Sequence, residues 1–141
     1  MIPNPFGPYE ELRFTTFLIK QWFEGKSAHV SAPNYIRDNV PVDLLALAYG
    51  RFAEALTDNP GFEKSNPSFY AGLQGEFTQR FAEEMKARLK MPCDFTLGEQ
   101  EEFPEPRIRT NTDLIDAVNL GWNESIFWDQ LANYYQKTHG F

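Results

Sequence analysis

The sequence predicts an α+β fold that is mostly helical, with four or five helices and two to four short strands. Apolar and aromatic residues recur at helical spacing in several long segments, and a few short segments are extended or alternate. Proline and glycine separate these segments. The 141 residues have the length of one domain, so residues 1–141 are expected to form a single domain, and 42% hydrophobic residues supply its core.

Composition excludes several classes of protein. The net charge is −7, which disfavours nucleic-acid binding, because such binding depends on clustered Lys and Arg. The longest apolar run, 42–49, is too short to cross a membrane, and the first residues lack the features of a signal peptide. A single cysteine, Cys93, fits a reducing compartment. We therefore expect a cytoplasmic protein with no nucleic-acid and no membrane partner.

The first third of the chain is expected to begin with an extended segment over residues 1–9, which is rich in Pro and Gly and ends in a turn. Helical spacing of apolar residues predicts a helix over 10–24, which begins with two acidic residues and stops at a glycine. Residues 28–36 are expected to be extended, with an interruption at Pro33. A charged turn, Arg37-Asp38-Asn39, is expected to follow.

The middle of the chain predicts a helix over 44–56, with Asp43 as its N-cap. This helix is apolar on most sides, so we expect it to be the central and most buried one. Residues 57–73 contain several turn sequences and leave room for one short strand near 62–65.

The last third predicts two long helices, over 74–90 and 124–138, because aromatic and aliphatic residues recur there at helical spacing. Alternating apolar residues predict a strand over 93–97. Residues 98–106 are acidic and contain prolines, which is typical of a solvated loop, and a short helix is expected over 113–120.

We find no known catalytic or metal-binding motif in the sequence. It contains no phosphate-binding loop, no zinc-ligand spacing and no nucleophile elbow. His29 and His139 are isolated, and the alternating apolar context of Cys93 favours a core thiol over a nucleophile. The glutamates of 99–105 favour a solvated loop over a cation site. No reaction can be derived from these residues alone.

Two places are more informative. Asn4 precedes a rigid Pro-Phe-Gly-Pro turn, which suits a fixed hydrogen-bonding amide facing a polar ligand and equally suits a structural turn. Arg37 lies just ahead of the helix capped by Asp43. Its guanidinium can bind a phosphate through two hydrogen bonds, or pair with Asp38 or Asp43 as a structural ion pair.

Five motifs, taken in order along the chain, resemble a known family. They are Asn4-Pro5-Phe6-Gly7-Pro8; the helix 10–24 with Gly25 and the extended residues around Val30; Arg37-Asp38 with Val42 and Asp43-Leu44; Asn66-Pro67-Ser68; and Asp113, Ala117 and Leu120-Gly121-Trp122. Together they resemble the C-terminal, substrate-binding half of the extended short-chain dehydrogenase/reductases of the NAD-dependent epimerase/dehydratase type.

The resemblance implies a nucleotide-sugar ligand. Asn4 and Arg37 would contact its polar and phosphate groups, with Tyr35 and Phe6 as pocket walls. The family binds NAD(P) with a Gly-rich turn and uses a Tyr-x-x-x-Lys pair, all in a preceding half that this sequence lacks. We therefore expect no cofactor in this chain alone. The family's arginine in an Arg-Pro-Gly-Asp motif is replaced by Phe103 in Phe103-Pro104-Glu105.

The resemblance implies a detached substrate-binding region that is catalytically silent alone and needs an N-terminal half for epimerase or dehydratase chemistry. The alternatives are a non-catalytic oligomeric interaction module and a fragment of a longer epimerase. Without the nucleotide-binding half, sheet edges and apolar surface would be open. We therefore expect a homo-oligomer, or a complex with the missing half.

Overall fold

The computed structural model describes residues 3–9, 13–58 and 64–140, and it confirms the predicted α+β class. The helices are α1 (Phe14–Phe23), α2 (Val42–Asp58), α3 (Gln74–Leu89) and α4 (Glu124–His139). The strands within the described residues are β1 (Asn4–Phe6), β2 (Ala28–Val30), β3 (Ile36–Pro41), β4 (Pro67–Ser68), β5 (Tyr70–Leu73), β6 (Phe95–Leu97), β7 (Ile108–Arg109) and β8 (Asp113–Leu114). These strands are more numerous than the predicted two to four.

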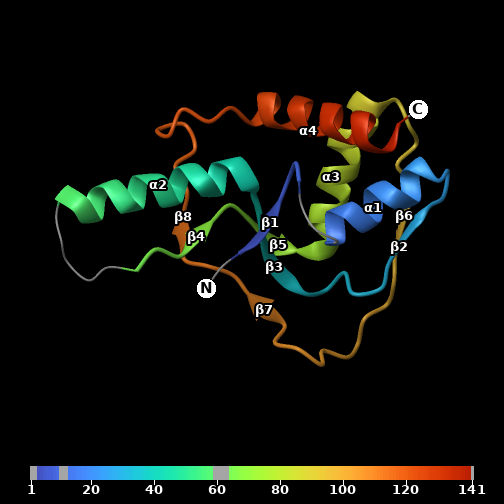
Figure 1. Ribbon diagram of the computed structural model, residues 1–141. Helices are drawn as coiled ribbons and strands as arrows, with labels where there is room; N and C mark the ends of the chain where they lie inside the picture. Colours follow the sequence, from blue (N-terminus) through green and yellow to red (C-terminus); the bar gives the residue numbers. More distant parts are fainter. Residues whose placement is uncertain (1–2, 10–12, 59–63, 141) are drawn as a thin grey trace.

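Strand β3 is the centre of the main sheet. It pairs in parallel with β1 and β7 and antiparallel with β5 (Figure 1). Two further parallel pairs, β2–β6 and β4–β8, each connect segments distant in the sequence. The sheet therefore gathers residues from both ends of the chain around β3.

The main core lies between α1, α3, α4 and the first strand of the sheet. Phe6 is at its centre and is only 2% exposed. Five aromatic rings surround it with ring centroids 5.2–6.3 Å away, namely Tyr70, Phe77, Phe81, Phe127 and Trp128. Such ring pairs add to the stability already gained from burial. The aromatic core therefore anchors β1.

The turn after β1 requires glycine. Gly7 has φ +146°, which side-chain-bearing residues rarely adopt, and an added Cβ would lie 2.6 Å from Cγ1 of Val42. The close approach packs the turn against the start of α2. The extended N-terminal segment ending in a turn is thus confirmed within the described residues.

Helix α2 was expected to be the most buried helix, and this prediction was wrong. Only Leu44 and Leu45 are buried, where they join Val40 and Ile115 in a second, smaller core. The rest of α2 extends away from the other three helices (Figure 1). Phe52 and Leu56 are half-buried and belong to neither core. No described helix is long and apolar enough to span a membrane.

Two local predictions were also wrong. The expected charged turn Arg37-Asp38-Asn39 is the buried middle of β3, because neighbouring strands and side chains satisfy most of its polar groups. The expected helix 113–120 is not formed: residues 113–114 are strand β8, which pairs with β4, and residues 117–120 form turns. Residues 10–12 of the helix predicted over 10–24, and residues 62–63 of the strand predicted near 62–65, lie outside the described residues.

The carboxylate of Asp38 connects β3 to two distant segments. It is 2% exposed and accepts hydrogen bonds from the backbone N–H groups of Phe69 (2.9 Å) and Asn111 (3.1 Å). Phe69 lies between β4 and β5, and Asn111 lies between β7 and β8. One side chain therefore positions both segments against the central strand.

The substitution Asp38→Asn is expected to lower the free energy of unfolding by about 2 to 3 kcal/mol, because an amide has one acceptor oxygen and leaves one buried N–H without a partner. Urea unfolding followed by circular dichroism measures the change. Asp58→Asn, at the exposed end of α2, is the matched control and should stay near the wild type. Equal stability of the two variants would contradict this role for Asp38.

Candidate functional site

A cavity of about 300 Å³ lies beside β1, β2 and β3. Three of the four predicted site residues, Asn4, Tyr35 and Arg37, line it together. Asn4 comes from the first strand and Arg37 from the central one, two residues before the Asn39 with which Asn4 is in register. The pairing of β1 with β3 therefore brings both predicted polar residues into one cavity.

Arg37 is the most distinctive residue of this cavity. Its side chain is 9% exposed. Nη1 donates to the backbone carbonyls of Ile36 (3.0 Å) and Arg107 (2.9 Å), whereas the buried Nη2 has no hydrogen-bond partner. A buried donor without a partner costs free energy. An anion in the cavity would provide the missing acceptor.

The electrostatic surroundings of Arg37 leave it receptive to an anion. Burial lowers its pKa, the nearby cation of Arg109 lowers it further, and Glu105 and Tyr35 act in the opposite direction. The guanidinium carbon lies 4.3 Å from the centre of the Tyr35 ring, a cation–π contact. The arginine stays charged at neutral pH. The cavity therefore contains a fixed, incompletely compensated cation.

The loop between β6 and β7 closes one side of the cavity. The backbone N–H of Glu105 donates to the Tyr35 hydroxyl (3.2 Å), and Phe103 packs edge-on against the Tyr35 ring. Asn34 forms two hydrogen bonds with Gln100. The segment predicted as a solvated loop is indeed a loop with exposed glutamates, and it is also attached to the strand that carries Arg37.

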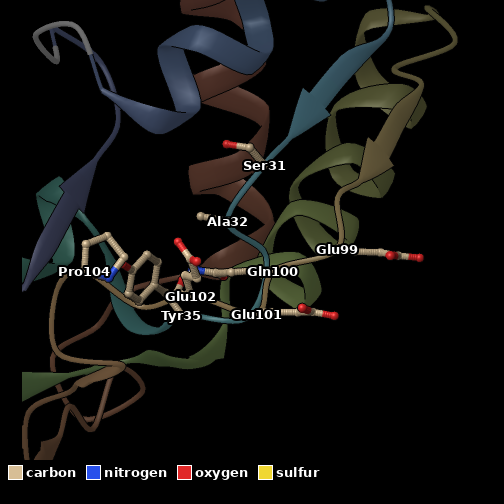
Figure 2. A pocket seen from close by; sticks show the side chains of 8 residues that line it. All are labelled: Ser31, Ala32, Tyr35, Glu99, Gln100, Glu101, Glu102 and Pro104. Atoms are coloured by element: carbon tan, nitrogen blue, oxygen red, sulfur yellow. The ribbon is translucent and has the colours of Figure 1, made fainter.

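A second cavity of about 610 Å³ adjoins the first and shares Ser31, Ala32 and Tyr35 with it. Figure 2 shows Gln100 directed toward Tyr35, whereas the carboxylates of Glu99 and Glu101 point to the opposite side. The carboxylates of Glu99 and Glu101 thus point away from Tyr35. Both volumes fall in the range of small-molecule pockets.

The fourth predicted site residue, Phe6, does not line the Arg37 cavity. It lies in the aromatic core and lines a different cavity, of about 270 Å³, that also includes Asn4. The sequence reasoning missed other lining residues, namely Phe14, Phe17, His29, Gln74 and Glu105. Only their place in the fold identifies them, since they come from α1, β2, α3 and the loop before β7 and form no motif.

The junction between β5 and α3, which contains Gly72 and Gly75, does not fit the pyrophosphate of a dinucleotide. The first N–H groups of α3 are occupied, because Gln74 donates to the Tyr35 carbonyl (2.9 Å) and Gly75 donates to the Pro33 carbonyl (3.0 Å). A phosphate binding there would need those donors. Within the described residues no group of His, Cys, Asp and Glu side chains is arranged to hold a metal ion.

Comparison with solved structures identifies the fold. UDP-glucose 4-epimerase from Thermotoga maritima, solved with UDP-glucose, matches with a TM-score of 0.56 and 19% identity. The match covers 96% of this chain and 44% of the epimerase. The chain has the fold of one part of that enzyme. The predicted resemblance to epimerases is therefore confirmed at the level of the fold, and the chain spans less than half of the enzyme's length.

A second structure, WbmH from Bordetella bronchiseptica in complex with NAD+, matches with a TM-score of 0.48 and 19% identity. That match covers 98% of this chain and 44% of WbmH. No family model matches the sequence, and neither does any curated protein.

Cys93 lies away from the candidate site, in the main core. Burial raises its pKa from 9.0 to about 11, and Asp94 adds to the effect. The thiol was predicted to be a core residue, and its burial confirms this.

The native thiol should react about a hundredfold more slowly with a disulfide reagent at pH 8 than the unfolded thiol, because its thiolate fraction is that much smaller. Reaction rates with and without urea test this. The pKa is raised in the folded state, so the stability from the neutral thiol is complete below pH 9 and is lost as the pH rises toward 11. Equal reaction rates in the two states would contradict the buried position.

Proposed function

We propose that the chain is the ligand-binding region of a nucleotide-sugar epimerase- or dehydratase-like protein, and that Arg37 binds a phosphate of the ligand. The observation that carries the proposal is that Arg37 lines a cavity and that its buried Nη2 has no hydrogen-bond partner. The fold shared with part of an epimerase solved with UDP-glucose supports the class of ligand.

The arrangement of the cavity is consistent with such a ligand. Nη1 of Arg37 is held by two carbonyls, so Nη2 keeps a fixed direction and needs little reordering on binding. Asn4 adds an exposed amide with both a donor and an acceptor. The aromatic side chains of Phe14, Phe17 and Tyr35 provide apolar surface. The cavity thus offers charge, hydrogen bonding and ring contact together.

Chemistry at a bound sugar would need groups that this chain does not provide. In the epimerase and dehydratase family the resemblance implies that a preceding half holds NAD(P) and the catalytic Tyr-x-x-x-Lys pair. We propose that the chain alone is catalytically silent, and that a nucleotide-binding half, covalent or separate, completes the protein.

Calorimetric titration with UDP-glucose tests the proposal. Wild-type protein should bind, and Arg37→Lys should weaken binding about tenfold or more, because lysine keeps the charge and loses the directed Nη2. Asn4→Ala, at an exposed position, should weaken binding without lowering the melting temperature.

Arg51→Lys is the matched control for the arginine-to-lysine change, since Arg51 is exposed on α2 and pairs only weakly with Glu54 at 4.0 Å. The melting temperature of each variant separates lost binding from lost folding. Failure of the wild type to bind UDP-glucose, or unchanged affinity in both Arg37→Lys and Asn4→Ala, would contradict the proposed ligand site.

A second candidate function is a non-catalytic module that self-associates through α2. The specific observation is that α2 extends from the body and presents Phe52 and Leu56, which pack in neither core. Leu114 of β8 is also exposed (73%). Apolar side chains left outside the cores favour association.

If α2 mediates self-association, Phe52→Glu should convert an oligomer into a monomer in size-exclusion chromatography with light scattering, because a buried charge is costly at an apolar interface. Leu47→Glu, on the opposite side of α2 and exposed (43%), carries the same charge change and should leave the oligomer intact. A monomeric wild type at micromolar concentration would exclude this candidate.

A further inference from the structure

His29 lines the same cavity as Arg37 and comes from a different strand. It is the exposed middle residue of β2, and its neighbours Ala28 and Val30 are buried in the main core. Successive side chains of a strand point to opposite faces, so the imidazole lies on the face of β2 away from the core, where it borders the cavity. The cavity therefore contains a histidine as well as the arginine.

The imidazole of His29 is held at one nitrogen. Its Nδ1 lies 2.9 Å from the hydroxyl oxygen of Thr96, the residue in register with His29 on β6. This hydrogen bond limits rotation of the ring and leaves Nε2 as the nitrogen that can meet a ligand. The residue next to Nε2 is a glycine, Gly98, and a Cβ there would lie 3.3 Å from Nε2 and 3.3 Å from Cα of Ser31. The absence of a side chain at Gly98 therefore keeps this end of the ring uncovered.

Among the described groups around the cavity, the imidazole is the one whose type changes charge near neutral pH. Histidine ordinarily gains a proton between about pH 8 and about pH 5, whereas carboxylates, tyrosine, lysine and arginine ordinarily titrate outside that range. The other charged and titratable groups on the elements around His29 are all of those types. They are Tyr35, Arg37 and Glu105 of the cavity, Asp94 and Glu99 at the two ends of β6, and Lys20 of α1, which packs against β2.

The formal charge of the cavity therefore depends on His29. At about pH 8 the lining side chains include one cation, Arg37, and one anion, Glu105, and these two charges cancel. A protonated His29 leaves the cavity with a net positive charge. A positive charge in a cavity attracts an anionic ligand, and a neutral imidazole does not.

We propose that His29 is a further ligand-binding residue, and that its protonation makes the binding of an anionic ligand tighter in mildly acidic solution. This inference rests on the proposed ligand site and adds to it a dependence on pH. Arg37 supplies a permanent cation, and His29 supplies a cation that is present only below neutral pH. The affinity of the cavity for its ligand thus follows the pH of the surroundings.

Calorimetric titration of the full chain with UDP-glucose, at about pH 5.5 and at about pH 8 in low salt, tests this role. Both phosphoryl groups of this probe carry an ester bond and share a bridging oxygen, so neither has the proton that a phosphate monoester loses near pH 6. Wild-type protein should bind about two- to fivefold more tightly at the lower pH. The effect is modest because His29 is exposed and solvent screens its charge.

Three variants identify the group responsible. His29→Gln is uncharged at both pH values and keeps an amide that can bond with Thr96, so its affinity should not change with pH. His29→Arg is charged at both pH values, so it should bind tightly at both. His139→Gln is the matched control and should keep the wild-type dependence, because the other histidine of the chain lies beside the Phe23 ring (5.5 Å) and does not line the cavity.

The outcomes separate the role of His29 from the ligand site itself. Binding that Arg37→Lys weakens, but that is equally tight at the two pH values in the wild type, overturns the role of His29 and leaves the ligand site intact. A pH dependence that persists in His29→Gln, or that disappears in His139→Gln, also overturns it. Melting temperatures at both pH values show whether each variant is folded. If neither the wild type nor His29→Arg binds UDP-glucose at either pH, the proposed function fails and this inference fails with it.

Discussion

The buried carboxylate of Asp38 is the interaction on which the candidate site depends. It joins the central strand to the backbone of Phe69 and Asn111, from segments that lie 31 and 73 residues further along the chain. These bonds position β7, whose Arg109 faces Arg37, and β5, which continues into α3. Neighbouring segments supply partners for the buried polar groups of Arg37, Asp38 and Asn39, apart from Nη2 of Arg37, and this stabilises a polar stretch in the middle of a sheet.

The helices could be predicted from sequence because their signal is local. Apolar residues at helical spacing in α3 and α4 indicate both the element and its buried face, and the observed bounds lie within a residue of those expected. Most of the short strands showed no such signal, since two or three residues have no periodicity, although the alternation over 93–97 did predict β6. Arg37-Asp38-Asn39 resembled a turn for a related reason: its partners are distant, and polar triplets are usually exposed.

The site could be predicted only in part, and by resemblance rather than by pattern. Asn4, Tyr35 and Arg37 line one cavity, whereas Phe6 packs in the aromatic core and does not line that cavity. Glu105 was placed in a solvated loop because nothing near it in the sequence shows that the loop folds back over β3. Pairs such as Arg37 and Arg109 arise from strand register, which a single sequence does not reveal.

The pairing of β3 with strands from both ends of the chain has a consequence for synthesis. A ribosome produces β1 and β3 early, β5 follows at mid-chain, and β7 and the Asn111 that binds Asp38 emerge later still. Until then several polar groups of Arg37, Asp38 and Asn39 have no partner other than water. Non-local contacts of this kind slow folding and keep sheet edges open in nascent chains. The cavity beside β1, β2 and β3 is thus among the last features to be completed.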